Sequence, residues 1–231
     1  MFLKNKGLVC LLGIVVIGFW AVPAFAEGLL GTGHSYYYDS QYWEGTVEIN
    51  STPGQPLEGS VDWAVFTADE FNSLFGGGGY MPTSGQLVYT YQLHNGPESS
   101  TITLYDVLIQ GSAPMGNPGW FEGVDPEVTG QDPSSSVLGV SQVLWYFSDL
   151  TDQGGANYNL DPDEASMGLA FCSDRNPQTG VSIAVNEGES AWIPGVASPG
   201  TVEIPEPSII TLLVGAMATL GISVIRWHRR R

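Results

Sequence analysis

The chain has 231 residues and a formal net charge of −17, from 7 Lys and Arg against 24 Asp and Glu. So few bases cannot neutralise many phosphates, which excludes a nucleic-acid binder and removes nucleic acid from the expected partners. A hydrophobic content of 43% excludes a disordered acidic tail. The length suits one domain of about 100–200 residues with additional segments at its ends.

The first 26 residues have the organisation of a secretory signal peptide, which is helical in its apolar part. Two lysines make its beginning positive, and an apolar run extends to about Trp20. Ala24 and Ala26 are small residues three and one before a cut in front of Glu27. We therefore expect signal peptidase to remove residues 1–26. The alternative is an uncleaved anchor, but the run is short for a membrane span of about 20 residues.

Residues 27–204 carry nearly all of the acidic charge. Six of the seven bases lie in the two end segments, so Arg175 is the only base here against 23 acids, a net charge of −22. Cys172 is the only cysteine of this part, which excludes an intrachain disulfide in it. We expect residues 27–200 to form one exported domain.

Short runs rich in Val, Tyr, Thr, Trp and Ile alternate in this domain with turn residues, which is typical of β-strands. About eight strands at such spacing predict an all-β fold, specifically an antiparallel β-sandwich of jelly-roll or Ig-like type. Alternation within each run predicts one buried and one solvent-facing side per strand. The clearest runs are Gly45–Asn50, Val61–Val65, Leu87–Tyr91, Ser100–Ile109, Gln142–Phe147, Gly168–Cys172 and Val181–Val185.

One short helix is predicted after the second of these runs. Thr67 and Glu70 have the spacing of a capping box, and an apolar i, i+3, i+4 stripe begins at Phe71. Gly76–Gly79 should end the helix. Glycine-rich loops also bind phosphate, but no lysine follows and the strand–loop–helix order is missing, so we interpret this one as a turn.

Aromatic residues are concentrated at the beginning of the exported domain. Flat aromatic rings with a polar rim bind sugars, so this cluster is a candidate glycan contact. The alternative is an amphipathic first strand whose rings cover the core. The cluster consists of Tyr36, Tyr37, Tyr38, Tyr42 and Trp43.

An acidic loop is the candidate metal site. Hard oxygen ligands at irregular spacing suit Ca²⁺, although the loop lacks the residue order of an EF-hand. The alternative is a solvated acidic loop; apart from calcium, no cofactor is expected. The candidate ligands are Asp149, Asp152, Asp161, Asp163 and Glu164.

No catalytic set is recognisable in the exported domain. A Gly-x-Ser-x-Gly elbow is missing, and His34 and His94 are expected at the surface. Cys172 follows an apolar run and is expected to be a buried small hydrophobe rather than a reactive thiol. Paired carboxylates can hydrolyse glycosides, but among 23 acids a suitable pair arises by abundance alone. We therefore expect a non-catalytic protein.

The last segment, residues 201–231, combines a short motif, an apolar stretch and a basic end. Pro205, Glu206 and Pro207 precede the uncharged residues 208–225. These form a helix of about 27 Å, close to the hydrocarbon thickness of a bilayer. The basic end should stay cytoplasmic, leaving the domain outside. An ordinary C-terminal anchor is the alternative. The basic end contains Arg226, Arg229, Arg230 and Arg231.

The order of the Pro-Glu-Pro motif, one membrane span and a terminal arginine cluster resembles the PEP-CTERM sorting signal of Gram-negative bacteria. The resemblance implies processing by an exosortase, a membrane-embedded cysteine transpeptidase, and transfer to the cell surface or an extracellular polysaccharide matrix. Pro205, Glu206 and Pro207 would then be recognition residues of a substrate. The runs Val61–Phe66, Tyr89–Gln92 and Val143–Phe147 also resemble uncharacterised β-rich ectodomains that accompany this signal.

The leading hypothesis is therefore an exported, non-catalytic cell-surface or matrix protein associated with exopolysaccharide, which passes transiently through the inner membrane. A secreted carbohydrate-binding module is the alternative. A charge of −22 repels anionic polymers. The more specific version of either hypothesis is therefore a contact that depends on calcium.

Overall fold

The computed structural model describes residues 35–50, 57–76, 79–110, 115–122, 130–148, 158–186 and 188–203. The signal segment with Ala24 and Ala26 and the sorting region from Pro205 onward therefore lie outside the described residues. In the part that is described, no helix is long and apolar enough to cross a membrane.

The described chain consists of antiparallel β-strands and one helix, which confirms the all-β prediction. In chain order the elements are β1 (Tyr37–Tyr38), β2 (Gln41–Tyr42), β3 (Glu44–Asn50), β4 (Glu58–Thr67), α1 (Ala68–Phe75), β5 (Leu87–Asn95), β6 (Leu104–Leu108), β7 (Gly119–Phe121), β8 (Ser135–Leu138), β9 (Gln142–Tyr146), β10 (Gly168–Ser173), β11 (Arg175–Val185) and β12 (Ser190–Glu203).

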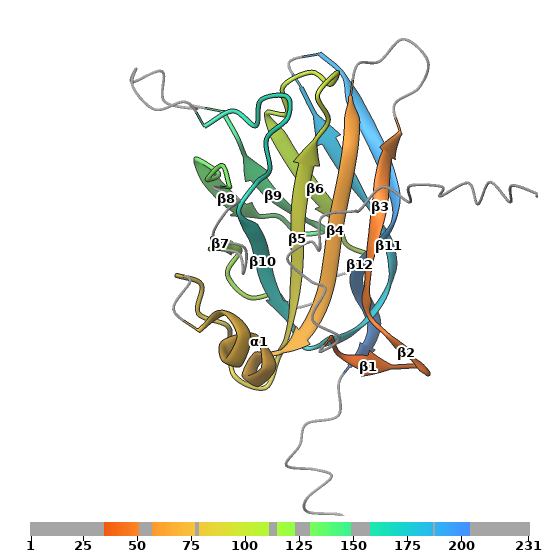
Figure 1. Cartoon of the computed structure of the whole chain (residues 1–231). Coiled ribbons are helices and arrows are strands. Elements are labelled where there is room, and N and C mark those ends of the chain that lie inside the picture. Colours follow the sequence, from red (N-terminus) through yellow and green to blue (C-terminus); the bar gives the residue numbers. More distant parts are fainter. Residues whose placement is uncertain are drawn as a thin grey trace, which may run out of the picture.

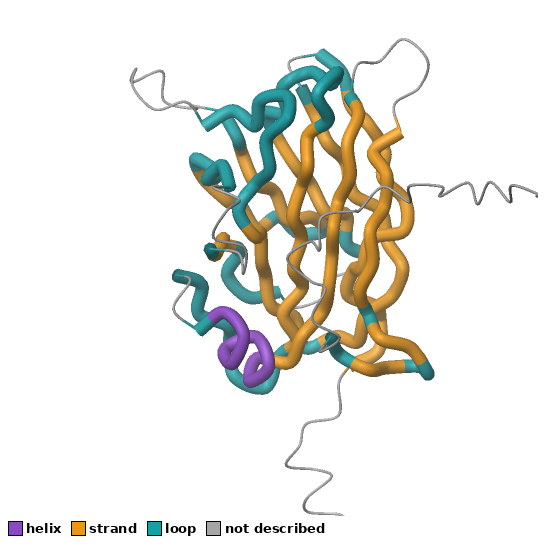
Figure 2. The backbone as a smooth tube through the Cα atoms, viewed as in Figure 1, coloured by secondary structure: helices purple, strands orange, loops and turns teal. Residues whose placement is uncertain are grey.

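These strands form one hairpin and two larger sheets. Strands β1 and β2 pair with each other. The first sheet has the order β3-β4-β5-β10-β7, and the second has the order β12-β11-β6-β9-β8. The two sheets face each other, and α1 lies at one end of the first sheet (Figures 1 and 2).

The inward sides of the two sheets share one aromatic core. Tyr91 and Phe171 of the first sheet and Tyr105 and Trp145 of the second are fully buried. Across the sheets, the ring centroids of Tyr91 and Tyr105, of Tyr91 and Trp145, and of Phe171 and Trp145 lie 6.0 to 6.3 Å apart. The polar atoms also bind across the sheets, because Tyr91 Oη donates to the Ala197 carbonyl at 2.6 Å. This hydrogen bond and the packed rings together fix the position of one sheet on the other.

A second, smaller core lies on the outer side of the first sheet. Every residue of β10 and all of β5 except His94 are buried, so the prediction of one solvent-facing side is wrong for these strands. Phe71 and Phe75 of α1 cover Phe66 on β4, with ring centroids 5.7 Å apart for Phe66 and Phe75. The outer side of these strands is apolar because the helix that follows β4 folds back onto it.

The helix begins and ends as predicted. The hydroxyl of Thr67 accepts from the Glu70 backbone N–H, and the Glu70 carboxylate accepts from the Thr67 N–H, which completes the capping box. Gly76 is the C-cap residue. A Cβ at this position would lie 2.1 Å from the Asn72 carbonyl oxygen, which explains the glycine.

The last strand was not predicted. Strand β12 is 14 residues long although it contains Pro194 and Pro199, which usually interrupt strands. It forms an edge of the second sheet and pairs with β11 alone, so a missing N–H can face away from the partner. The predicted strand Ser100–Ile109 is shorter than expected, with only Leu104–Leu108 in β6.

Candidate functional site

The structure divides the predicted glycan-contact cluster into exposed and buried parts. Tyr37 and Tyr42 lie on the β1–β2 hairpin and are 59% and 56% exposed. Their rings meet edge to face, with centroids 5.1 Å apart and an interplanar angle of 65°. Trp43 is buried in the main core, and its Nε1 donates to the Tyr38 carbonyl at 3.1 Å. The surface available to a ligand is thus a tyrosine pair rather than a flat platform of five rings.

Tyr36 and Tyr38 connect the hairpin to the main core. Their rings are stacked, with centroids 6.1 Å apart, and both pack against core residues. Tyr36 Oη donates to Asn176 Oδ1 at 3.3 Å, and partial burial raises the pKa of the Tyr36 phenol. These contacts join the beginning of the described domain to β11, so this half of the cluster has a structural role.

Three of the five candidate calcium ligands are described and form one turn. The Asp161 backbone N–H donates to Glu164 Oε2 at 2.9 Å, and Thr101 Oγ1 donates to Asp161 Oδ1 at 3.0 Å. Asp163 adopts a left-handed conformation with φ of 67°. Asp149 and Asp152 lie outside the described residues. Among the residues the structure covers, no group of three or more His, Cys, Asp or Glu side chains is arranged to hold a metal ion.

A polar pocket of about 350 Å³ opens beside this turn. Hydroxyl and amide groups line it, and Thr101, one of the lining residues, is the donor to Asp161. Side chains of this type can both donate and accept hydrogen bonds, as sugar hydroxyls require. The lining residues are Ser100, Thr101, Thr103, Asn159 and Asn186.

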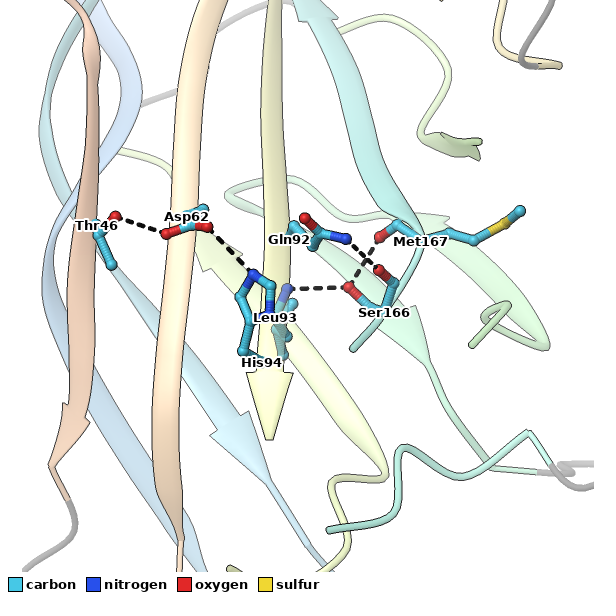
Figure 3. A network of polar contacts seen from close by, with 7 residues as sticks. All are labelled: Thr46, Asp62, Gln92, Leu93, His94, Ser166 and Met167. Carbon is cyan, nitrogen blue, oxygen red and sulfur yellow. Dashed lines mark hydrogen bonds and ion pairs between the residues drawn. The ribbon is translucent and has the colours of Figure 1, made fainter. Parts of the chain in front are cut away.

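Sequence reasoning did not identify the polar network on the outer side of the first sheet. Thr46 Oγ1 donates to Asp62 Oδ1 at 2.6 Å, and His94 Nε2 lies 3.1 Å from Asp62 Oδ2. Figure 3 shows these three side chains on the neighbouring strands β3, β4 and β5. The His94 side chain is only 30% exposed, which corrects its expected surface position.

This arrangement holds Asp62 in place. Both carboxylate oxygens have partners although Asp62 is only 8% exposed. The Thr46 hydroxyl binds the carboxylate and not the imidazole, so these groups do not have the nucleophile–base–orienter order of a hydrolytic triad. The network therefore satisfies a buried charge and links three strands.

A second set of polar contacts continues the network toward β10. Gln92 Nε2 donates to the Ser166 carbonyl at 3.0 Å, and the Leu93 N–H donates to Ser166 Oγ at 3.0 Å. Ser166 Oγ in turn donates to the Met167 carbonyl at 2.8 Å (Figure 3). The outer side of the first sheet is therefore polar at the end away from α1.

The sequence contains one signal for this network. Asp62 alternates with Val61 and Trp63, which places its side chain on the opposite side of the strand from the core. Its partners depend on the register, because Thr46 lies directly opposite Asp62 whereas His94 lies diagonally. Register between strands so far apart in sequence is a tertiary property.

A larger open pocket of about 590 Å³ lies beside β7 and was also missed. Tyr80, Met81 and Trp120 provide apolar surface in it, and Glu122 and Asp132 provide carboxylates. Tyr80 Oη donates to the Asn117 carbonyl at 2.9 Å and lies 3.2 Å from Cys172 Sγ.

Cys172 is 1% exposed, as expected of a buried small hydrophobe. Burial raises the pKa of its thiol, which opposes formation of a reactive thiolate. Burial likewise raises the pKa of the Tyr80 phenol. At neutral pH these two groups are uncharged and support the wall of the β7 pocket.

Comparisons of this chain with protein-family models, with curated proteins and with solved structures found no match.

Proposed function

We propose that this protein is an exported, non-catalytic component of the cell surface or extracellular matrix that associates with exopolysaccharide. In this proposal signal peptidase removes residues 1–26. An exosortase recognises Pro205, Glu206 and Pro207 and releases the domain from its membrane span, residues 208–225. The domain passes through the inner membrane only transiently and ends at the cell surface or in the matrix.

The observation that supports this proposal is that the C-terminal end of the last strand and the acidic turn lie at opposite ends of the domain. The chain leaves the last strand at Glu203, which pairs with Arg175, and the β1–β2 hairpin lies at the same end (Figure 1). Asp163 donates its N–H to the Asn95 carbonyl at the far end of β5, so the acidic turn lies at the opposite end. A domain held at Glu203 would present its acidic turn and polar pocket to the surroundings.

The shared core of two facing sheets favours a β-sandwich, and we propose this architecture, of jelly-roll or Ig-like type, for the domain. Antiparallel sheets that bury one common core are typical of such folds. Many exported binding domains with unrelated ligands are built this way, so the architecture suits the proposal without naming a ligand.

The sorting step is tested by mass spectrometry of the protein recovered from the cell surface and medium of the producing bacterium. We expect a product that lacks the arginine tail, and accumulation of unprocessed Glu206→Gln protein in the membrane fraction. Glu203→Gln removes the same charge three residues earlier and should be processed normally. An intact tail in the exported product would contradict the proposal.

The second candidate function is a carbohydrate-binding module, which the β7 pocket favours. Its aromatic and carboxylate lining offers stacking surface and hydrogen-bond acceptors for sugar hydroxyls. A glycan array separates this pocket from the hairpin. We expect binding to be lost in Glu122→Gln/Asp132→Asn and kept in Tyr37→Ser/Tyr42→Ser if the pocket is the site. The reverse result assigns the hairpin, and no binding removes the candidate.

Calcium dependence has a direct test, because an ion that binds only the folded state must raise the melting temperature. We expect millimolar Ca²⁺ to raise it and Mg²⁺ to have a smaller effect. Asp161→Asn/Asp163→Asn should abolish the shift, whereas Asp69→Asn on α1 should leave it unchanged. A melting temperature that does not respond to Ca²⁺ would discard the calcium contact.

A further inference from the structure

The outer side of the second sheet has an unusual composition for so acidic a domain. One row of residues is in register across all five strands, from β12 through β11, β6 and β9 to β8. Four of its five members are apolar, and the central one is an aspartate. The row is Trp192, Ile183, Asp106, Leu144 and Val137.

The neighbouring rows on the same side are also mostly apolar. Val181 and Leu108 are opposite each other in one row, and Val185, Leu104 and Tyr146 form the other. Gln142, Ser135 and Ser190 lie at the ends of these rows. We call these three rows the β12–β8 face. A mostly apolar surface with few charged groups is typical of the buried part of protein–protein interfaces.

Asp106 in the middle of this face has an incomplete set of hydrogen bonds. It is 7% exposed, and its Oδ1 is buried without a hydrogen-bond partner. Desolvation raises the pKa of Asp106 to about 6. Of the side chains that the paired strands present in these rows, only that of Tyr146 is titratable as well. A carboxyl group so placed loses its charge more easily than an exposed one when the face is covered.

One edge of this face, β8, is protected only by its short length of four residues. Edge strands usually carry charges, prolines or very few residues, which prevents pairing with another chain. Strand β3 carries Glu44 and Glu48, β12 contains Pro194 and Pro199, and β7 has three residues. Strand β8 has the sequence Ser-Ser-Val-Leu, without charge or proline, and Val137 is 45% exposed on it.

We propose that the β12–β8 face is the surface through which two copies of this chain associate. Most of the domain repels a second copy, because it carries 23 acids against one base. The β12–β8 face adds little to this repulsion, since the single carboxyl group in its three rows is buried. The association is independent of whether the C-terminal segment is processed.

The size of the face sets the expected strength. Five strands at about 4.8 Å and three rows at about 6.7 Å span about 24 by 20 Å. This is below the roughly 800 Å² per partner of a stable interface, so the dimer should be weak and transient. A glycan is a poorer occupant, because seven of the nine apolar residues are aliphatic and offer neither stacking surface nor hydrogen bonds.

The test is sedimentation velocity of the full-length chain over a hundredfold range of concentration. The chain is reconstituted in lipid nanodiscs that contain one copy each. We expect dimers at the highest concentrations, and more of them as NaCl rises, because salt screens the repulsion between acids without weakening apolar contact. Trp192→Ser and Val137→Lys, both at exposed positions, should each weaken the association at least tenfold. Asp106→Asn should strengthen it about threefold, since no charge is then desolvated.

Tyr37→Ser is the matched control, because Tyr37 is 59% exposed and Trp192 is 61% exposed, on different surfaces. It should leave the association unchanged. Monomers at every concentration would overturn the proposal. Dimers unaffected by both face variants would place the contact elsewhere, and dimers that dissociate as NaCl rises would indicate a charge-mediated contact. Glycan binding that is lost in Trp192→Ser would assign the face to a sugar instead.

Discussion

The side chains on the outer sides of the two sheets are covered in different ways. On the first sheet, α1 covers the apolar end, and hydrogen-bonded polar side chains occupy the other end. On the second sheet, apolar side chains extend across all five strands, and the residue at their centre is Asp106. The first side is complete within one chain, whereas the second has the composition of a surface that another molecule covers.

Two aspartates make this comparison quantitative. Asp62 and Asp106 are 8% and 7% exposed, so both have left water to a similar extent. Both oxygens of Asp62 have partners, but Oδ1 of Asp106 has none. Burial without a partner destabilises the charged form of a carboxyl group. The hydrogen-bond partners, rather than burial, therefore separate the structural aspartate from the destabilising one.

Removal of the helix cover should have the largest effect on stability. Phe71→Ala deletes a fully buried ring between α1 and the first sheet and should lower the free energy of unfolding by about 3–5 kcal/mol. Denaturant titration measures the loss, and Asn72→Ala, an exposed neighbour on α1, should change it by less than about 0.5 kcal/mol. Equal effects of the two substitutions would show that α1 does not stabilise this side.

Asp62→Ala should cost less, about 2–3 kcal/mol, because it leaves the Thr46 hydroxyl and the His94 ring without their common partner. Glu48→Ala, at an exposed position on β3, is the control for the loss of one negative charge. The measurement is again denaturant titration at pH 7. A loss no greater than that of the control would mean that the network is only a surface contact.

Asp106→Asn should instead stabilise the protein, by about 2 kcal/mol at pH 8. The pKa of Asp106 rises from 3.8 to about 6 on folding, so the native state holds this proton more tightly than the unfolded state. The native protein therefore gains stability from this group as pH falls through 6 toward 3.8.

The advantage of Asp106→Asn over the wild type should accordingly shrink across this pH interval and disappear below it. The difference between the two unfolding curves, measured at several pH values, isolates Asp106 from the other acids. A difference that does not vary with pH would show that Asp106 has an ordinary pKa and that the two outer sides do not differ in this respect.

The helix cap should give the smallest effect. Thr67→Ala removes the acceptor for the Glu70 N–H and should cost about 1 kcal/mol. Ser73→Ala, an exposed position within α1, serves as the control in the same thermal unfolding assay. If both substitutions have the same effect, the capping box does not contribute to holding the helix on the first sheet.

Local patterns predicted much of the fold. Alternation within Val61–Val65 and Leu87–Tyr91 predicted β4 and β5, and the spacing of Thr67 and Glu70 predicted the helix start. The longest strand, β12, was missed because it contains two prolines. A strand tolerates proline at the edge of a sheet, and the edge position is not visible in the sequence.

The candidate sites were less predictable. Composition marked the five aromatic residues from Tyr36 to Trp43 as one group, and packing divided them. The Asp62 network and the β12–β8 face both depend on register between strands that are distant in sequence. No local pattern contains this information.

The sequence by itself determined the all-β class, the capped helix and a domain with one base. It also carries the Pro-Glu-Pro tail on which the sorting proposal depends. Each of these follows from residue types or from spacings of a few positions. Tertiary structure alone decided which outer side α1 covers, which aspartate has partners and which tyrosines remain exposed. Burial and hydrogen bonding depend on neighbours from remote segments, and these become neighbours only when the sheets pair.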